Sequence, residues 1–311
     1  MHLDETLFKQ MLLEKTDYCE KVLHAYLPTV DSLTGSDKCA GVVVDAMQYS
    51  VMAGGKRLRP LFICETNRMY GGRPELAEPF MAALEMIHNY SLVHDDMPAM
   101  DNDEYRRGVK TTWVKYGEGM AVLAGDALLN YAYESALKAF DMCQNAQETA
   151  AVIRAMKVLS RNAGIYGMVG GQCADLEAEK KPRETDGEVL TYIHKHKTAC
   201  MIESGFQIGA ILAGAPDDDV AKLGKIAENI GIAFQIQDDI LDVIGDSEEL
   251  GKLTGSDEKD GKVTYVTMYG LAKAAGDVRA MTDEALTLYD SLSSSNAFLR
   301  ELIVRLITRT K

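Results

Sequence analysis

Apolar residues recur at helical spacing along most of this 311-residue chain, and this periodicity constrains the fold more than any other feature. No segment of useful length alternates between apolar and polar residues, as a half-buried strand would, and no short tandem repeat is present. Leu, Ala, Met, Glu and Lys, which favour helices, recur throughout, and only 7 prolines interrupt them. We therefore expect an all-α protein that folds as a single large helical bundle.

Loops are expected where Gly, Pro, Ser, Asp or Asn gather. None of these segments is long enough, or simple enough in composition, to be a linker between domains, so we expect one domain over residues 1–311. The expected loops span residues 28–37, 70–74, 98–111, 181–187, 214–218, 245–262 and 291–296.

Charge and cysteine usage limit the partners and the compartment. The net charge of −14, from 33 basic and 47 acidic residues, disfavours nucleic acid as the main partner. The 6 cysteines form no CxxC pair and no disulfide-framework spacing. The first ten residues, MHLDETLFKQ, lack the apolar core of a signal peptide, and no apolar stretch is long enough to span a membrane. We expect a reduced, cytoplasmic protein.

One informative helix is expected over about residues 79–94, and its apolar, core-facing side ends in a carboxylate. His88 and Asp95 are seven residues apart, so they face nearly the same way. Asp95 and Asp101 are six apart and would not share a face of a regular helix. Pro98 lies between them and should break or bulge the helix, and a bulge of two residues, such as Met97–Pro98, would bring Asp101 back towards Asp95.

A second informative helix is expected over about residues 220–244, where Phe234, Asp238 and Asp242 follow one another at a spacing of four. This stripe, too, runs from apolar residues to carboxylates. Buried carboxylates are costly unless positive charge compensates them. Mg²⁺ supplies that charge, since it takes oxygen ligands and also binds substrate phosphates. Two such clusters favour a metal site over two solvated helix ends.

Clusters of basic residues stand out against the acidic background. The string GGKRLRP at 54–60 brings Lys56, Arg57 and Arg59 together, and Arg106–Arg107 follows the first Asp cluster directly. Arg and Lys beside carboxylates that hold Mg²⁺ indicate a clamp for phosphates. For any one of these residues alone, a surface charge is the simpler interpretation.

Several motifs resemble those of one enzyme family. The string SLVHDDMPAMDNDEYRRG at 91–108 resembles the first Asp-rich motif of the trans-prenyl diphosphate synthases, and FQIQDDILD at 234–242 resembles the second. GGKRLRP, His88, GDALL at 125–129, GGQCADLE at 170–177 and HKT at 196–198 match in order and approximate spacing. The resemblance spans about residues 40–270. The Met97–Pro98 insertion and Tyr90, five residues before Asp95, resemble the bacterial farnesyl diphosphate synthases in particular.

The resemblance implies an isoprenoid synthase fold, an all-α bundle with a deep central cavity that is usually a homodimer. It also implies three Mg²⁺ ions and, as substrates, isopentenyl diphosphate and the allylic dimethylallyl and geranyl diphosphates, which yield farnesyl diphosphate. By this resemblance the metal ligands are Asp95, Asp101 and Asp238, with Asp96 and Asp242 as further candidates. The resemblance also implies that the allylic diphosphate is bound by Arg106, Lys197 and Lys252, and the isopentenyl diphosphate by Lys56, Arg59, His88 and Arg107. It implies that oxygen atoms of Thr198 and Gln235 face the carbocation.

These roles fit the chemistry of prenyl transfer. An allylic C–O bond ionises when its leaving diphosphate is stabilised by metal ions and fixed cations. The resulting cation survives in a cavity that excludes water, where isopentenyl diphosphate adds to it. By resemblance, the proton is then lost to the released diphosphate. Product length is expected to depend on Tyr90 and Ser91, because the Tyr90 ring, somewhat over one turn below Asp95, can form the cavity floor.

Three alternatives remain at this stage. A geranylgeranyl diphosphate synthase of the same family has nearly the same motifs and differs near Tyr90 and Ser91. An HD-type metal phosphohydrolase would use His94–Asp95, but the sequence offers no further histidines at metal-ligand spacing. An inactive subunit that supports a catalytic chain is the non-enzyme alternative, and the intact Asp motifs argue against it.

Overall fold

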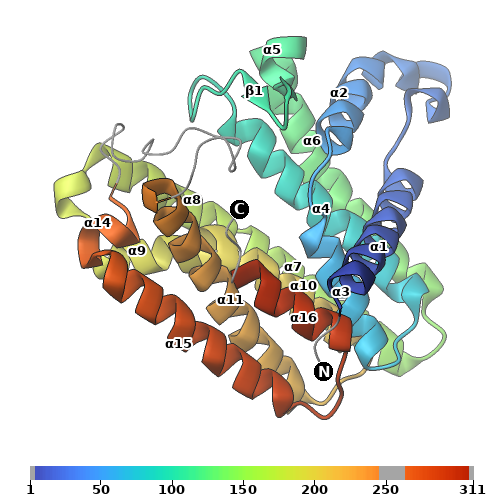
Figure 1. Cartoon of the computed structure of the whole chain (residues 1–311). Coiled ribbons are helices and arrows are strands. Elements are labelled where there is room, and N and C mark those ends of the chain that lie inside the picture. Colours follow the sequence, from blue (N-terminus) through green and yellow to red (C-terminus); the bar gives the residue numbers. More distant parts are fainter. Residues whose placement is uncertain (1–3, 245–262, 308–311) are drawn as a thin grey trace.

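The computed structural model describes residues 4–244 and 263–307, and it confirms the all-α fold (Figure 1). The long helices are α1 (Glu5–Tyr26), α2 (Gly41–Met52), α3 (Leu58–Met69), α4 (Pro74–Asp95), α6 (Glu118–Leu137), α7 (Ala146–Ala163), α8 (Met168–Lys180), α10 (Cys200–Leu212), α11 (Asp217–Ile244), α15 (Leu271–Asp290) and α16 (Ala297–Ile307). The short ones are α5 (Thr112–Tyr116), α9 (Gly187–Ile193), α14 (Tyr265–Tyr269), the 3₁₀ turns η1 (Val30–Ser32), η2 (Gly35–Ala40), η3 (Lys138–Met142) and η4 (Pro182–Glu184), and a π-helix, η5 (His194–Ala199).

Helix α10 lies in the middle of the bundle and packs against α3, α7 and α11. Its sequence, CMIESGFQIGAIL, is apolar almost all the way round, as a helix buried on every side requires. Glycine allows the close approach of α3, because a Cβ atom at Gly205 would lie 2.9 Å from Cβ of Phe62 and one at Gly209 would collide with the Thr66 hydroxyl. The α3–α10 contact therefore holds the end of α3 that follows GGKRLRP firmly against the core.

Helix α4 runs beside α3 and α6, and α11 runs beside α10 and α15. Both informative helices are somewhat longer than expected from the sequence. Helix α4 begins at Pro74, a favoured first position because the missing N–H would be unpaired there anyway. Helix α11 begins at Asp217, where three consecutive aspartates complement the positive end of the helix dipole.

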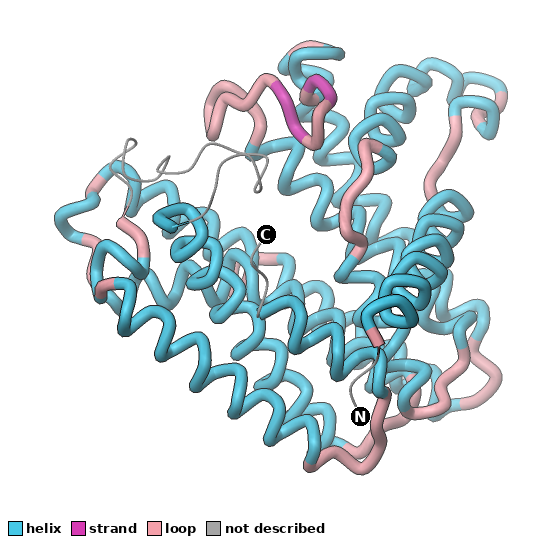
Figure 2. The backbone as a smooth tube through the Cα atoms, viewed as in Figure 1, coloured by secondary structure: helices cyan, strands magenta, loops and turns pink. Residues whose placement is uncertain are grey.

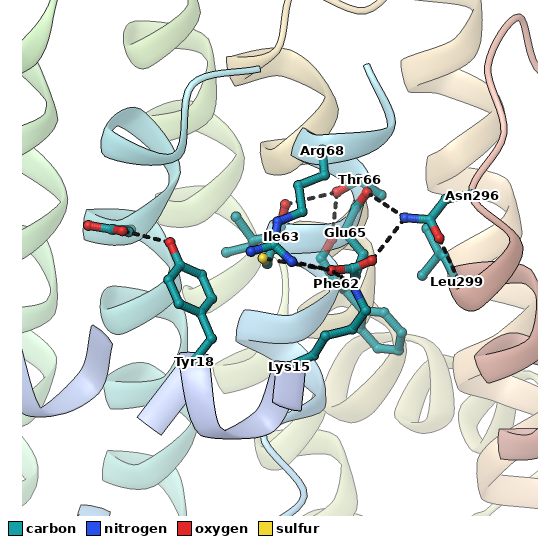
Figure 3. A network of polar contacts seen from close by, with 11 residues as sticks. Lys15, Tyr18, Phe62, Ile63, Glu65, Thr66, Arg68, Asn296 and Leu299 are labelled. Carbon is teal, nitrogen blue, oxygen red and sulfur yellow. Dashed lines mark hydrogen bonds and ion pairs between the residues drawn. The ribbon is translucent and has the colours of Figure 1, made fainter. Parts of the chain in front are cut away.

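The first and last described helices also contact each other, with the rings of Phe8 and Phe298 stacked 5.4 Å apart. A buried carboxylate on α3 joins them (Figure 3). Glu65 accepts from Lys15 of α1 at 2.8 Å and from the side-chain amide of Asn296 at 2.9 Å. Asn296 caps α16 by accepting from the backbone N–H of Leu299. Glu65 therefore ties α1 and the start of α16 to the same point of the core.

The expected loops are largely confirmed, and three of them contain short regular structure, one being 181–187 with the 3₁₀ turn η4. Segment 98–111 holds a small antiparallel hairpin, β1 (Tyr105–Arg106) and β2 (Val109–Lys110), drawn in magenta in Figure 2. Segment 28–37 holds η1 and the start of η2. The expected loop at 245–262 lies outside the described residues. No described helix is long and apolar enough to cross a membrane.

Candidate active site

A cavity of about 400 Å³ lies between α4, α8 and the π-helix. Asp95 and His88, which the sequence places on nearly the same side of α4, both line it, so this expectation is confirmed. Its apolar wall includes Met100, Met168 and Leu176. The predicted site residues that line it are Arg59, His88, Tyr90, Ser91, Asp95, Lys197 and Thr198.

The chain reverses where α4 ends. Of the break or bulge expected at Pro98, the structure shows the break, because α4 stops at Asp95 and a series of turns follows. The backbone N–H of Asp101 donates to the carbonyl oxygen of Asp95 at 2.8 Å, and that of Asp103 donates to Asp96 at 3.1 Å. Asn102, with φ +56°, makes the reversal. Asp101 thus returns to the end of α4, as the bulge was expected to achieve.

The two aspartates at the end of α4 have different surroundings. Burial raises the pKa of Asp95 to about 6 despite the opposing charge of Lys197, and its carboxylate makes no hydrogen bond with any residue in the described part of the chain. Burial likewise raises the pKa of Asp96 to about 6. Asp96, however, pairs with Arg106, whose Nε lies 2.5 Å from Oδ1. Asp95 is therefore the less constrained carboxylate of the two, whereas Asp96 orients Arg106.

Lys197 and Thr198 lie in the π-helix between α9 and α10, a geometry often found at functional sites. Gly171 of α8 lies directly against the backbone of Lys197, where any larger residue would collide. Lys197 Nζ lies 2.5 Å from Oδ2 of Asp175, one turn along α8. Asp175 was not among the predicted site residues, although its place as an acidic residue in the matched motif GGQCADLE was an available signal.

A second cavity of about 570 Å³ lies at the start of α3. Arg59 and His88 line both cavities, so the two adjoin. Arg107 has φ +54°; its guanidinium donates to the carbonyl oxygen of Gly54 and lies flat against Gly55. A Cβ atom at Gly55 would lie 2.9 Å from Cζ of Arg107, so only glycine leaves room there. The predicted residues gathered here are Lys56, Arg59, His88 and Arg107.

The second cavity has an excess of positive charge near its walls. Burial, and then the neighbouring Arg59 and Arg107, hold the pKa of His88 well below its usual range, so the imidazole is neutral. Burial also lowers the pKa of Arg59, whose Nε is buried without a hydrogen-bond partner among the described residues. Such a cationic group, left without its acceptor, fits an anionic ligand.

The second Asp-rich motif lies near the C-terminal end of α11. Asp238 and Asp242 are one turn apart, as expected, and Asp242 is buried. Asp239 accepts from the backbone N–H of Tyr265 at 2.7 Å, which fixes the start of α14. Lys252, an expected diphosphate ligand, lies outside the described residues.

Within residues 4–244 and 263–307, no three His, Cys, Asp or Glu side chains converge on one point as a closed metal site. The predicted residues in these ranges that line neither cavity are Asp96, Asp101, Arg106, Gln235, Asp238 and Asp242. Mg²⁺ is usually held by one or two carboxylates together with water and substrate phosphates. The Asp95 carboxylate, which accepts no hydrogen bond from the described residues and lies near Lys197, fits that mode of binding.

The His94–Asp95 pair does not have the arrangement of a metal hydrolase. His94 Nε2 contacts the carbonyl oxygen of Val122 at 3.2 Å, and its ring lies against Gly125 of α6, where a side chain would collide. The imidazole therefore packs α4 against α6.

Comparison with known proteins settles the family. The polyprenyl synthetase family model matches residues 41–300. The chain belongs to the polyprenyl synthetase family. This prenyltransferase is 45% identical to a farnesyl diphosphate synthase of Escherichia coli over 78% of its own length and 80% of the relative's. It is 43% identical to a geranylgeranyl diphosphate synthase of Cyanophora paradoxa, with 78% and 79% covered.

A solved structure of similar fold is a geranyltransferase of Helicobacter pylori complexed with magnesium and isoprenyl diphosphate. It is 30% identical, with a TM-score of 0.78 and 98% of each chain covered. The polyprenyl synthetases are Mg²⁺-dependent and act on prenyl diphosphates. The relatives carry both farnesyl and geranylgeranyl names, so the family alone does not fix the product length.

Proposed function

We propose that this synthase condenses isopentenyl diphosphate with dimethylallyl and then geranyl diphosphate to give farnesyl diphosphate. The observation that carries the proposal is the pair of adjoining cavities that share Arg59 and His88. One is partly apolar and contains Asp95; the other is surrounded by cations. A reaction between one diphosphate that ionises and another that adds needs two such compartments side by side.

The allylic diphosphate occupies the mouth of the 400 Å³ cavity. Asp95 and Asp101, with Asp238 from α11, hold Mg²⁺, of which we expect three ions, and the bound metal supplies Lewis acidity to the leaving diphosphate. Lys197 and Arg106 bind the same group, and Lys252 is assigned to it by resemblance. Ionisation of the allylic C–O bond leaves the positive charge on the hydrocarbon, below these groups.

The cavity wall protects that charge from water. Met100, Met168 and Leu176 offer no nucleophile, so an allylic cation beside them is not quenched. Thr198 lines the same cavity, and Gln235 follows Phe234, which lines the adjoining one. We assign their side-chain oxygen atoms to stabilising the cation by their dipoles.

Isopentenyl diphosphate occupies the 570 Å³ cavity, with its diphosphate bound by Lys56, Arg59, His88 and Arg107. Neutral His88 donates a hydrogen bond from its N–H. Because Arg59 and His88 also border the allylic cavity, the double bond of isopentenyl diphosphate points towards the cation. The new C–C bond forms there, and the proton passes to the released diphosphate.

Tyr90 sets the length of the product. Its side chain is only 6% exposed, lies next to Ser91 in the wall of the allylic cavity, and packs edge-on against the His94 ring at 5.8 Å. A ring fixed in this way closes the space below Asp95. We therefore favour farnesyl over geranylgeranyl diphosphate as the product.

Product analysis tests the proposal. The purified protein is incubated with Mg²⁺, isopentenyl diphosphate and either dimethylallyl or geranyl diphosphate, and the dephosphorylated products are separated by chromatography. Farnesol as the main alcohol from both starters is the expected result. Geranylgeraniol as the main product would overturn the assigned length, and no elongation would favour the inactive-subunit alternative. The expected homodimer and cytoplasmic location stay predictions, the former testable by sedimentation.

A further inference from the structure

We propose that Arg57 is a positioning residue for isopentenyl diphosphate, and that its ion pair with Glu20 makes helix α1 part of the support of that site. The inference rests on the proposed function of the 570 Å³ cavity. It separates Arg57 from Lys56 and Arg59, with which the sequence grouped it.

Arg57 also lines the 570 Å³ cavity, but its guanidinium is bonded to groups of the protein. It is the N-cap residue of α3 and adopts the left-handed region at φ +47°, which non-glycine residues rarely occupy. Its side chain is completely buried, whereas Gly55 and Lys56 before it are exposed. An unfavourable backbone conformation persists only when the surrounding contacts enforce it.

The guanidinium of Arg57 supplies those contacts. Nε donates to Glu20 of α1 at 2.7 Å, Nη1 to Glu85 of α4 at 2.8 Å, and Nη2 to the carbonyl oxygen of Val51 in α2 at 2.6 Å. Three helices therefore meet on one side chain. The planar fork of arginine fixes their relative directions in a way that a lysine could not.

The residues next to Arg57 in the chain belong to the proposed binding site. Lys56 precedes it and Arg59 follows it by two, and both line the 570 Å³ cavity with His88 and Arg107. Gly54 and Gly55, at φ +97° and +141°, lead into this segment and give it little stiffness of its own. The buried Arg57 side chain therefore fixes the direction from which Lys56 and Arg59 approach the cavity.

Glu20 is the better partner for a test. Glu85 lines the cavity and is close to Arg59, Arg107 and His88, so changing it would alter the charge felt by the substrate directly. Glu20 is not among the residues that line the cavity. A change at Glu20 therefore acts on the substrate through Arg57, by its position and by the charge that it presents to His88 and Arg107, and Arg57→Lys, which keeps the charge, separates the two.

The chain offers a matched control on the same helix. Tyr18 of α1 donates a hydrogen bond to Glu78 of α4 at 2.6 Å, and neither residue lines the 570 Å³ cavity. Tyr18→Phe and Glu20→Gln each weaken one contact between α1 and its neighbours. Only the second weakens the hold on Arg57.

The test compares the KM values for isopentenyl and geranyl diphosphates. We expect Glu20→Gln to raise the KM for isopentenyl diphosphate at least about fivefold while the KM for geranyl diphosphate changes less than about twofold. Arg57→Lys should show the same split, because it keeps the charge but loses the fork. Tyr18→Phe should change neither KM, even where it lowers the melting temperature as much as Glu20→Gln does.

Two results would overturn the inference: equal effects of Glu20→Gln on both KM values, or no effect on either. Calorimetric titration of isopentenyl diphosphate into the wild-type protein and the Glu20→Gln variant measures the same site without turnover. If the wild type binds isopentenyl diphosphate but forms no product, the proposed function fails while the role of Arg57 is still tested.

Discussion

The backbone N–H of Asp101 lies 2.8 Å from the carbonyl oxygen of Asp95 and donates a hydrogen bond to it. This bond closes the turn after α4 and keeps two residues of the first Asp-rich motif at one end of the helix. The turn brings Asp101 back to Asp95, which a bulge at Met97–Pro98 was expected to do.

We predict that Asp95→Asn and Asp101→Asn each lower kcat by about 10²–10³, because each removes a charge that holds the metal against the leaving diphosphate. Asp103→Asn is the matched control from the same turn segment, because the Asp103 side chain is exposed and its ion pair with Arg106 is long, at 3.4 Å. It should lower kcat less than about threefold. Steady-state rates across a Mg²⁺ titration measure all three, and an Asp103→Asn defect as large as that of Asp95→Asn would contradict the assignment.

Replacement of Tyr90 tests the cavity floor. Tyr90→Ala removes the ring below Asp95, so we expect products longer than farnesyl diphosphate to become the majority. Tyr90→Phe keeps the ring and should keep the wild-type product. Chromatography of the dephosphorylated products from both variants is the measurement. A wild-type product pattern from Tyr90→Ala would place the floor elsewhere.

The Lys197–Asp175 pair predicts non-additive kinetics. Lys197→Ala should lower kcat about 10–100-fold. If Asp175 acts by holding Lys197, the double variant with Asp175→Asn should have a kcat less than about twofold below that of Lys197→Ala alone. The neighbouring pair of Lys195 with Glu228, 2.6 Å apart, gives the control, because Lys195 lines neither cavity. Lys195→Ala should leave kcat nearly unchanged. Additive losses in the double variant would show that Asp175 acts independently.

The carboxylate of Glu65 should matter for stability and not for chemistry. Glu65→Gln leaves Lys15 without its buried partner, so we expect the free energy of unfolding to fall by about 3 kcal/mol. The exposed pair of Lys21 with Asp17, also on α1, is the comparison. Asp17→Asn should change the free energy of unfolding by less than about 1 kcal/mol. Urea denaturation measures both, and similar losses would mean that the Glu65 network contributes little.

Some features of the site could be predicted from the sequence because they depend on local spacing. Asp238 and Asp242 share a face of α11, and His88 and Asp95 share a face of α4, since a regular helix repeats in a known way. Lys56 and Arg59 gather at one cavity because only two residues separate them.

Other features depend on contacts that no local pattern reveals. Arg57 differs from Lys56 because its partner Glu20 lies 37 residues earlier in the chain. The π-helix at His194–Ala199 disturbs the helical repeat too briefly to be recognised from periodicity. Pro98 predicted either a break or a bulge of the helix, and the choice of the break depends on the turn hydrogen bond from Asp101 to Asp95.

The most direct test measures, in one assay, the diphosphate that is released and the isopentenyl unit that is incorporated. Isopentenyl diphosphate labelled in its carbon chain is incubated with geranyl diphosphate, Mg²⁺ and the purified protein, and the released diphosphate and the labelled prenyl product are both measured. We predict that each diphosphate released is matched by one isopentenyl unit incorporated into farnesyl diphosphate. Release of diphosphate without incorporation of the label would contradict the claim that the two cavities carry out prenyl transfer.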